Sequence, residues 1–116
     1  MGTANDDFTV DVRREGERAR VAVTGELDIA TVPRLEAALT RVHDAGARLI
    51  ELDLAGLSFI DSSGIKLVVQ WSRRSANDGF DLRLKPGPAA VQEVFDMVGL
   101  SAQLPFEPRP PSARRR

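Results

Sequence analysis

Cysteine is absent from the 116-residue sequence, which excludes a disulfide framework, a thiol nucleophile and a cysteine-ligated zinc site. Long apolar runs are missing as well, because none approaches the roughly 20 residues that a membrane-spanning helix needs. The polar N-terminal stretch, residues 1–7, lacks the apolar segment of a signal peptide. These absences together predict a cytoplasmic protein without membrane association.

Acidic residues slightly outnumber basic ones over most of the chain. The whole sequence has a net charge of −1, but residues 107–116 hold four arginines and one glutamate, so the preceding residues carry −4. Binding to a phosphate backbone normally requires a basic face. The sequence therefore predicts no direct binding of nucleic acid.

Hydrophobic periodicity predicts one α/β domain. Alternating apolar residues indicate strands and spacings of three and four indicate helices, in the order strand, strand, helix, strand, helix, strand, helix. Single helices between successive strands favour parallel pairing, and the first two strands form a hairpin. We therefore expect a mixed, mostly parallel sheet of four to five strands with an N-terminal hairpin and three or more helices. By residue number the expected elements are 8–13, 19–23, 32–45, 49–54, 65–78, 80–84 and 91–98, with a weak last strand at 103–106.

Both ends of the chain differ from this domain, which we expect to span residues 8–106. Residues 108–116 contain three prolines and no apolar residue larger than alanine. Such a composition cannot bury enough apolar surface to fold. We expect residues 1–7 and 107–116 to be disordered.

A short polar motif, Asp61-Ser62-Ser63-Gly64, interrupts the apolar pattern after Ile60. Asp61 or Ser62 is expected to cap the next helix by accepting a hydrogen bond from an unpaired backbone N–H. A helix start also favours an added phosphate by roughly 0.3–1 kcal/mol, because free N–H groups and the positive end of the helix dipole lie there. Taken alone, the motif is most simply an ordinary helix start, and both interpretations stay open at this point.

Serine catalysis has no support in the rest of the sequence. A nucleophilic serine needs a general base, and the only histidine, His43, falls near the end of the first expected helix, where it should be solvated. The Gly-x-Ser-x-Gly elbow is missing around Ser62. No nucleotide-binding loop and no clustered set of metal ligands is evident. We predict no catalytic activity, no cofactor and no metal.

Three blocks of the sequence resemble, in order and spacing, the anti-sigma factor antagonist family, the bacterial STAS domain. They are VTGELDIATVPRL at 23–35, LDLAGLSFIDSSGIKLV at 52–68 and VQEVFDMVGL at 91–100, and the resemblance covers about residues 8–106. It implies a STAS-type domain in which Ser62, the first serine of the motif, is phosphorylated by a serine kinase that is also the anti-sigma factor. The unphosphorylated antagonist would bind this histidine-kinase-like ATPase and free a sigma factor, and a PP2C-type phosphatase would reset the switch.

The resemblance also implies partner-binding residues around Ser62. Asp28 matches an acid that lies near the phosphorylated serine in the family, although a turn residue before the first helix is an equally good interpretation. Asp61, Ser63 and Gly64 flank the serine and are expected at the same surface.

Three residues further along the second helix leave alternatives open. Lys66 stands where the family commonly has a small residue. It lies four residues after Ser62, so it is either a neighbour of a phosphate there or a solvated lysine. Leu67 and Trp71 share another face, which either packs on the third helix or contributes to a partner surface.

A second interpretation keeps the fold but changes the partner. The chain would then be a STAS subunit of a stress-signalling assembly or of a lipid or anion transport system. The intact Asp-Ser-Ser-Gly motif favours the phosphorylation switch, since a scaffold has no chemical need for an exposed serine.

Overall fold

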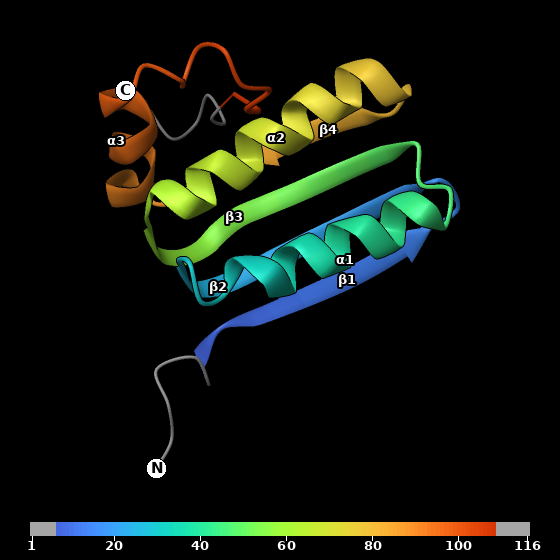
Figure 1. The fold of residues 1–116 in the computed structure, drawn as a ribbon, viewed down its shortest axis with the longest axis horizontal. Coiled ribbons are helices and arrows are strands. Elements are labelled where there is room, and N and C mark those ends of the chain that lie inside the picture. The colour runs from blue at the N-terminus through green and yellow to red at the C-terminus, as the bar shows by residue number, and fades with distance from the viewer. Residues whose placement is uncertain (1–6, 109–116) are drawn as a thin grey trace, which may run out of the picture.

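The computed structural model describes residues 7–108 and contains four strands and three helices in that range (Figure 1). The chain begins with the hairpin of β1 and β2 and then alternates helices with parallel strands. This order confirms the one that the sequence predicts. The elements are β1 (Thr9–Glu15), β2 (Arg18–Leu27), α1 (Val32–Asp44), β3 (Leu49–Ile60), α2 (Ser62–Asp78), β4 (Asp81–Lys85) and α3 (Ala89–Met97).

The strands form one sheet in the order β1-β2-β3-β4. β1 pairs with β2 antiparallel, whereas β2, β3 and β4 are parallel to one another. Helices α1 and α2 lie side by side across one face of this sheet (Figure 1). The predicted α/β class, with a mixed sheet and an N-terminal hairpin, is therefore confirmed.

The hydrophobic core lies between the sheet and the helices. Every second residue along the strands points toward the helices, and the buried faces of α1 and α2 pack on these rows. At the β4 edge, Phe95 of α3 packs edge-to-face on Phe106, with 5.1 Å between the ring centroids. Buried core residues in these rows are Val21, Val23, Leu27, Ile50, Leu52, Leu54, Leu82 and Leu84 from the sheet, and Leu35, Leu39, Val42, Ile65 and Val68 from the helices.

Strand β3 is longer than the sequence predicts, because it continues past Leu54 to Ile60. Its pairing with β2 has two irregularities, and each adds one residue on the β3 side. The buried positions Leu54, Leu57 and Ile60 are therefore spaced by three residues and not by two. Gly56 makes one of these irregularities possible. A Cβ on this glycine would lie 2.6 Å from the Cγ2 of Thr24.

The weak last strand at 103–106 is reduced in the structure to one bridge, Leu84 with Phe106. The N–H of Leu84 donates to the Pro105 carbonyl at 2.9 Å, and the N–H of Glu107 donates to the Leu84 carbonyl at 2.8 Å. Of the ends that we expect to be disordered, 1–7 and 107–116, only residues 7, 107 and 108 fall within the described range.

An aromatic cluster joins α1, α2 and the start of β4, and it corrects two expectations. His43 is not solvated, because its ring lies 4.8 Å from the ring of Phe80 and 6.1 Å from that of Trp71, leaving 23% of the side chain exposed. Trp71 is buried in this cluster on the side of α1, and Leu67 lines a groove with residues of α1. These two side chains therefore pack, as one interpretation held, but toward the first helix and not the third.

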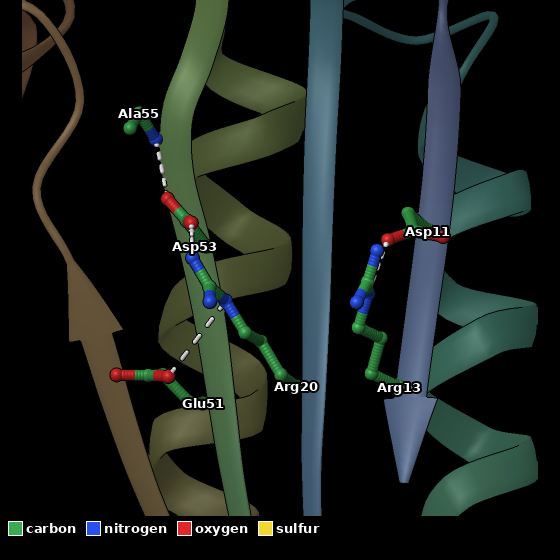
Figure 2. A network of polar contacts seen from close by, with 6 residues as sticks. All are labelled: Asp11, Arg13, Arg20, Glu51, Asp53 and Ala55. Atoms are coloured by element: carbon green, nitrogen blue, oxygen red, sulfur yellow. Dashed lines mark hydrogen bonds and ion pairs between the residues drawn. The ribbon is translucent and has the colours of Figure 1, made fainter.

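The opposite face of the sheet is polar. Figure 2 shows Arg20 of β2 reaching across to Asp53 and Glu51 of β3, with N–O distances of 2.6 Å and 3.9 Å. Burial alone raises the pKa of Asp53, but hydrogen bonds from Arg20 and from the Ala55 N–H outweigh it and leave that pKa below its ordinary value. In this network the buried carboxylate of Asp53 is paired with Arg20, and the pair links β3 to β2.

The buried position of Leu67 can be tested by truncation. Leu67→Ala should lower the free energy of unfolding by about 2–5 kcal/mol, because it removes a core side chain that is 2% exposed. The neighbouring exposed change Gln70→Ala should stay within about 0.5 kcal/mol of wild type. Urea unfolding, followed by the fluorescence of the single tryptophan, Trp71, measures both; equal stability of the two variants would contradict the packing toward α1.

The Asp53 network predicts a pH dependence of stability. Since the folded pKa of Asp53 lies below the unfolded value of about 4, its contribution is fully present above that pH and is lost as the pH falls toward the folded pKa. Wild type should therefore be more stable than Asp53→Asn at pH 7, and the difference should shrink below pH 4. Unfolding curves from pH 7 to pH 3 measure it, with Asp11→Asn in the exposed Arg13 pair as a control. A difference that is constant across this range would be inconsistent with the assigned ionisation.

Candidate functional site

The parallel strands β2 and β3 end side by side. Leu27 pairs with Ile60 in the last register of this ladder, and the N–H of Asp61 donates to the Leu27 carbonyl at 3.1 Å. The segments that follow, beginning with Asp28 and Asp61, therefore start at the same edge of the sheet. Ligand and partner sites of α/β sheets are commonly built at this carboxyl edge.

Asp61 is the N-cap of α2. Its backbone is extended, and its Oδ1 accepts hydrogen bonds from the N–H groups of Ser63 at 2.9 Å and Gly64 at 3.2 Å. The carboxylate thus satisfies two of the free donors at the helix start. Of the two capping residues that the sequence allowed, the structure selects Asp61 and leaves Ser62 as the first residue of the helix.

Ser62 is exposed at the surface, whereas Ser63 is half-buried. The hydroxyl of Ser62 has no hydrogen-bond partner within residues 7–108. The only histidine is packed in the aromatic cluster with Trp71 and Phe80 and is not bonded to either serine. The arrangement displays a hydroxyl without a base to activate it, which suits modification of the serine better than nucleophilic catalysis.

Gly64 is buried where α2 meets the ends of both strands. A Cβ at this position would lie 2.8 Å from the Cγ1 of Ile60 and 2.9 Å from the Cγ of Leu27. Only a residue without a side chain lets the first turn of α2 approach the sheet this closely. Among the residues expected to bind a partner, Gly64 therefore lies beneath the surface and acts through packing.

Asp28 organises the turn before α1. Its Oδ1 accepts hydrogen bonds from the N–H groups of Ala30 at 3.0 Å and Thr31 at 3.1 Å. Thr31 occupies the N-cap position of α1 but makes no side-chain capping bond; its hydroxyl is buried and donates to the Glu26 carbonyl at 2.8 Å. These hydrogen bonds support the interpretation of Asp28 as a turn residue. Because Asp28 directly follows β2, it also lies at the same sheet edge as Asp61.

A groove runs between the first turns of α1 and α2. Lys66 and Ser63 lie on its α2 wall, and Ile29 lies in the turn that leads into α1. Ile29 is 77% exposed, so it presents an unusually large apolar surface beside the serine motif. The groove is lined by Ile29, Val32, Pro33, Glu36, Ser63, Lys66, Leu67 and Gln70.

Sequence reasoning missed the α1 side of this groove. Ile29 and Pro33 look like ordinary residues of a helix start when the chain is read linearly. The one available signal was an isoleucine directly after the turn residue Asp28, where a polar residue is the usual choice.

The described residues offer no site for a metal or a membrane span. No group of three or more histidine, cysteine, aspartate or glutamate side chains in residues 7–108 could hold a metal ion. No helix in this part of the chain is both long and apolar enough to cross a bilayer.

Fold and site together describe a two-layer α/β domain that displays a serine at a capped helix start. Residues 10–105 match the family model described as "Mlab, STAS domain". The chain belongs to the anti-sigma factor antagonist family of STAS domains. Proteins of this kind are regulatory binding proteins and not enzymes, which agrees with the prediction that the chain has no catalytic activity.

Curated relatives of the chain include anti-sigma-B factor antagonists of staphylococci. The protein of Staphylococcus epidermidis is 32% identical over 80 residues, which is 69% of this chain and 74% of the relative. That of Staphylococcus aureus (strain NCTC 8325 / PS 47) is 29% identical over 94 residues, which is 81% of this chain and 87% of the relative.

Solved structures agree with this fold. The unphosphorylated form of the anti-sigma factor antagonist SpoIIAA is 26% identical, with a TM-score of 0.69 over 88% of this chain and 89% of its own. An anti-sigma factor antagonist from Mycobacterium paratuberculosis, 24% identical, gives a TM-score of 0.77 over 92% of this chain and 91% of its own. SpoIIAA from Bacillus has also been solved in a phosphorylated form, with a TM-score of 0.64 and 23% identity over 88% of this chain and 92% of its own.

The packing of Gly64 predicts the effect of a single methyl group. Gly64→Ala should lower the free energy of unfolding by about 1–3 kcal/mol through overpacking against Ile60 and Leu27. Alanine itself favours a helix by about 1 kcal/mol over glycine, so a loss of stability isolates the steric conflict. Thermal unfolding measures the change, with the exposed variant Lys66→Ala as a control. A Gly64→Ala protein as stable as wild type would mean that α2 can move away from the strand ends.

Proposed function

We propose that this protein is a phosphorylatable anti-sigma factor antagonist of the cytoplasm. In its unphosphorylated form it binds an anti-sigma factor serine kinase of the histidine-kinase-like ATPase type, and a sigma factor is released. Phosphorylation of Ser62 ends that binding, and a PP2C-type phosphatase restores it. The observation that carries the proposal is the exposed Ser62 hydroxyl, unpartnered within residues 7–108, at the start of a helix whose cap is already supplied by Asp61.

The position of Ser62 suits a switch that acts through charge. A phosphoserine carries about −1.5 to −2 charge at pH 7. The positive end of the helix dipole accommodates a phosphate here by roughly 0.3–1 kcal/mol, so the domain can stay folded when it is modified. The new charge would stand next to Asp61, and a partner docked on this surface would meet a strongly negative centre.

The greater exposure of Ser62 supports it over Ser63 as the modified residue. Ser63 is half-buried in the wall of the groove, and its N–H is held by Asp61. A kinase must place the attacking hydroxyl in line with a nucleotide phosphate, which requires free access to the oxygen.

We assign the predicted partner-binding residues to three roles. Ser63 and Lys66 are contact residues, because they line the open groove beside Ser62, and Ile29 joins them as an apolar contact. Asp28 and Asp61 shape the two loops of the site through their N–H hydrogen bonds. Gly64 sets the height of α2 above the strands from below.

The domain that performs this function is proposed to span residues 8–106. Its first buried side chain is Phe8, and its last strand-like contact is the bridge of Phe106 with Leu84.

Partner capture tests the proposal. Wild type, Ser62→Ala and Ser62→Asp serve as baits in a lysate of the source bacterium, and captured proteins are identified by mass spectrometry. Ser62→Ala should retain a serine kinase of the ATPase type together with wild type, and Ser62→Asp should lose it by at least about tenfold, the effect of 1.4 kcal/mol. The purified kinase with ATP should then add one phosphate to wild type and to Ser63→Ala but none to Ser62→Ala.

Equal capture by all baits would contradict the switch. If the captured proteins were subunits of a transporter or of a stress-signalling scaffold, the alternative STAS role would replace it, and the serine would serve only as a helix start.

A further inference from the structure

Lys66 lies beside the serine motif and has no charged partner among the described residues, 7–108. It lies on α2 four residues after Ser62, its side chain is exposed, and it makes no ion pair or side-chain hydrogen bond with any residue in 7–108. The two arginines of α2, Arg73 and Arg74, lie further along the helix, and Arg74 stacks on Trp71 and pairs with Asp78 near the helix end. Lys66 is also the single positively charged side chain among those that line the groove.

The charges around Ser62 are otherwise negative. Asp61 precedes it, Asp28 starts the neighbouring loop, and Glu36 lies on the opposite wall of the groove. The Asp61 carboxylate already accepts two backbone N–H bonds and has no positive partner in the described chain. A phosphate on Ser62 would therefore enter an acidic neighbourhood that contains one available counter-ion.

Helix geometry brings that counter-ion within reach. Residues four apart on an α-helix lie on the same face, with about 5–6 Å between their Cβ atoms. An acidic group placed N-terminal to a lysine at this spacing is the favourable order of the pair, because it also agrees with the helix dipole. The flexible lysine side chain can follow a phosphate oxygen without any change in the backbone.

We infer that Lys66 is the intramolecular counter-ion of a phosphate on Ser62 and stabilises the phosphorylated form of the domain. This inference rests on the proposed phosphorylation of Ser62 and adds a residue-specific element to it. Phosphorylation then creates a new ion pair at the first turn of α2 and fixes the Lys66 side chain at the mouth of the groove.

The inference is tested by phosphorus NMR on protein that carries phosphoserine at position 62, installed during translation or by ligation of a synthetic segment. The pH midpoint of the second phosphate ionisation is compared in wild type, Lys66→Ala and Lys66→Arg at about 0.1 M salt. Lys66 should lower this midpoint by about 0.2–0.4 pH units relative to Lys66→Ala, the usual strength of such a helix pair divided by 1.36 kcal/mol per unit. Lys66→Arg should restore most of the difference, and about 1 M salt should remove it.

Arg73→Ala is the matched control, because Arg73 is an exposed cation on the same helix but eleven residues from Ser62. At 1.5 Å per residue this separation is about 16 Å, beyond the screening length of about 10 Å at 0.1 M salt. Its midpoint should equal that of wild type. Thermal unfolding gives a second readout: installing the phosphate should raise the melting temperature more in wild type than in Lys66→Ala.

Equal midpoints and equal melting increments in wild type and Lys66→Ala would overturn the inference. An equal rise of the midpoint in Arg73→Ala would do so as well, since it would show a general field effect. Because the phosphate is installed without a kinase, none of these results bears on partner capture. Conversely, a failed capture experiment leaves the measured Lys66–phosphate pairing intact, so the two proposals fail separately.

Discussion

The rest of the structure depends on one constraint: α2 must approach the ends of the paired parallel strands β2 and β3 closely. Leu27 and Ile60 close the ladder, and Gly64 lets the next helix start directly above them. A bulkier residue at Gly64 would push the first turn of α2 away from the sheet. The height of Ser62 above the sheet, and its position beside the turn at Asp28, follow from this single contact.

Two aspartates convert that geometry into a defined surface. Asp28 and Asp61 each direct one carboxylate oxygen at two backbone N–H groups at the start of a loop or helix. Both loops are therefore ordered by hydrogen bonds within the chain, without help from a ligand. The carboxylates serve the architecture, and this leaves Ser62, Ile29 and Lys66 as the side chains that face outward. A surface prepared in this way loses little conformational entropy when a partner docks.

Periodicity in the sequence was sufficient to predict the element order and the mixed sheet, because buried strand and helix positions repeat at their own spacings. Periodicity failed where contacts between residues distant in sequence determine the local structure. β3 was predicted too short since its irregular pairing changes the inward spacing from two to three after Leu54. His43 was expected to be solvated, but Phe80 and Trp71, distant in sequence, enclose its ring. Thr31 stands at the N-cap position of α1 but makes no capping bond, because its hydroxyl donates to the Glu26 carbonyl and accepts from the Asp28 N–H.

The serine motif itself could be found from the sequence, but its geometry could not. Asp61 and Ser62 are both good capping residues, and only the backbone conformation distinguishes them. Once Asp61 supplies the cap, the hydroxyl of Ser62 is not needed to hold the helix, so its modification removes no hydrogen bond that the fold requires. A charge added at Ser62 would then alter the electrostatic surface while the core between sheet and helices keeps its packing. This separation of the structural cap from the displayed hydroxyl is the physical reason why one residue can change the binding state of the domain without unfolding it.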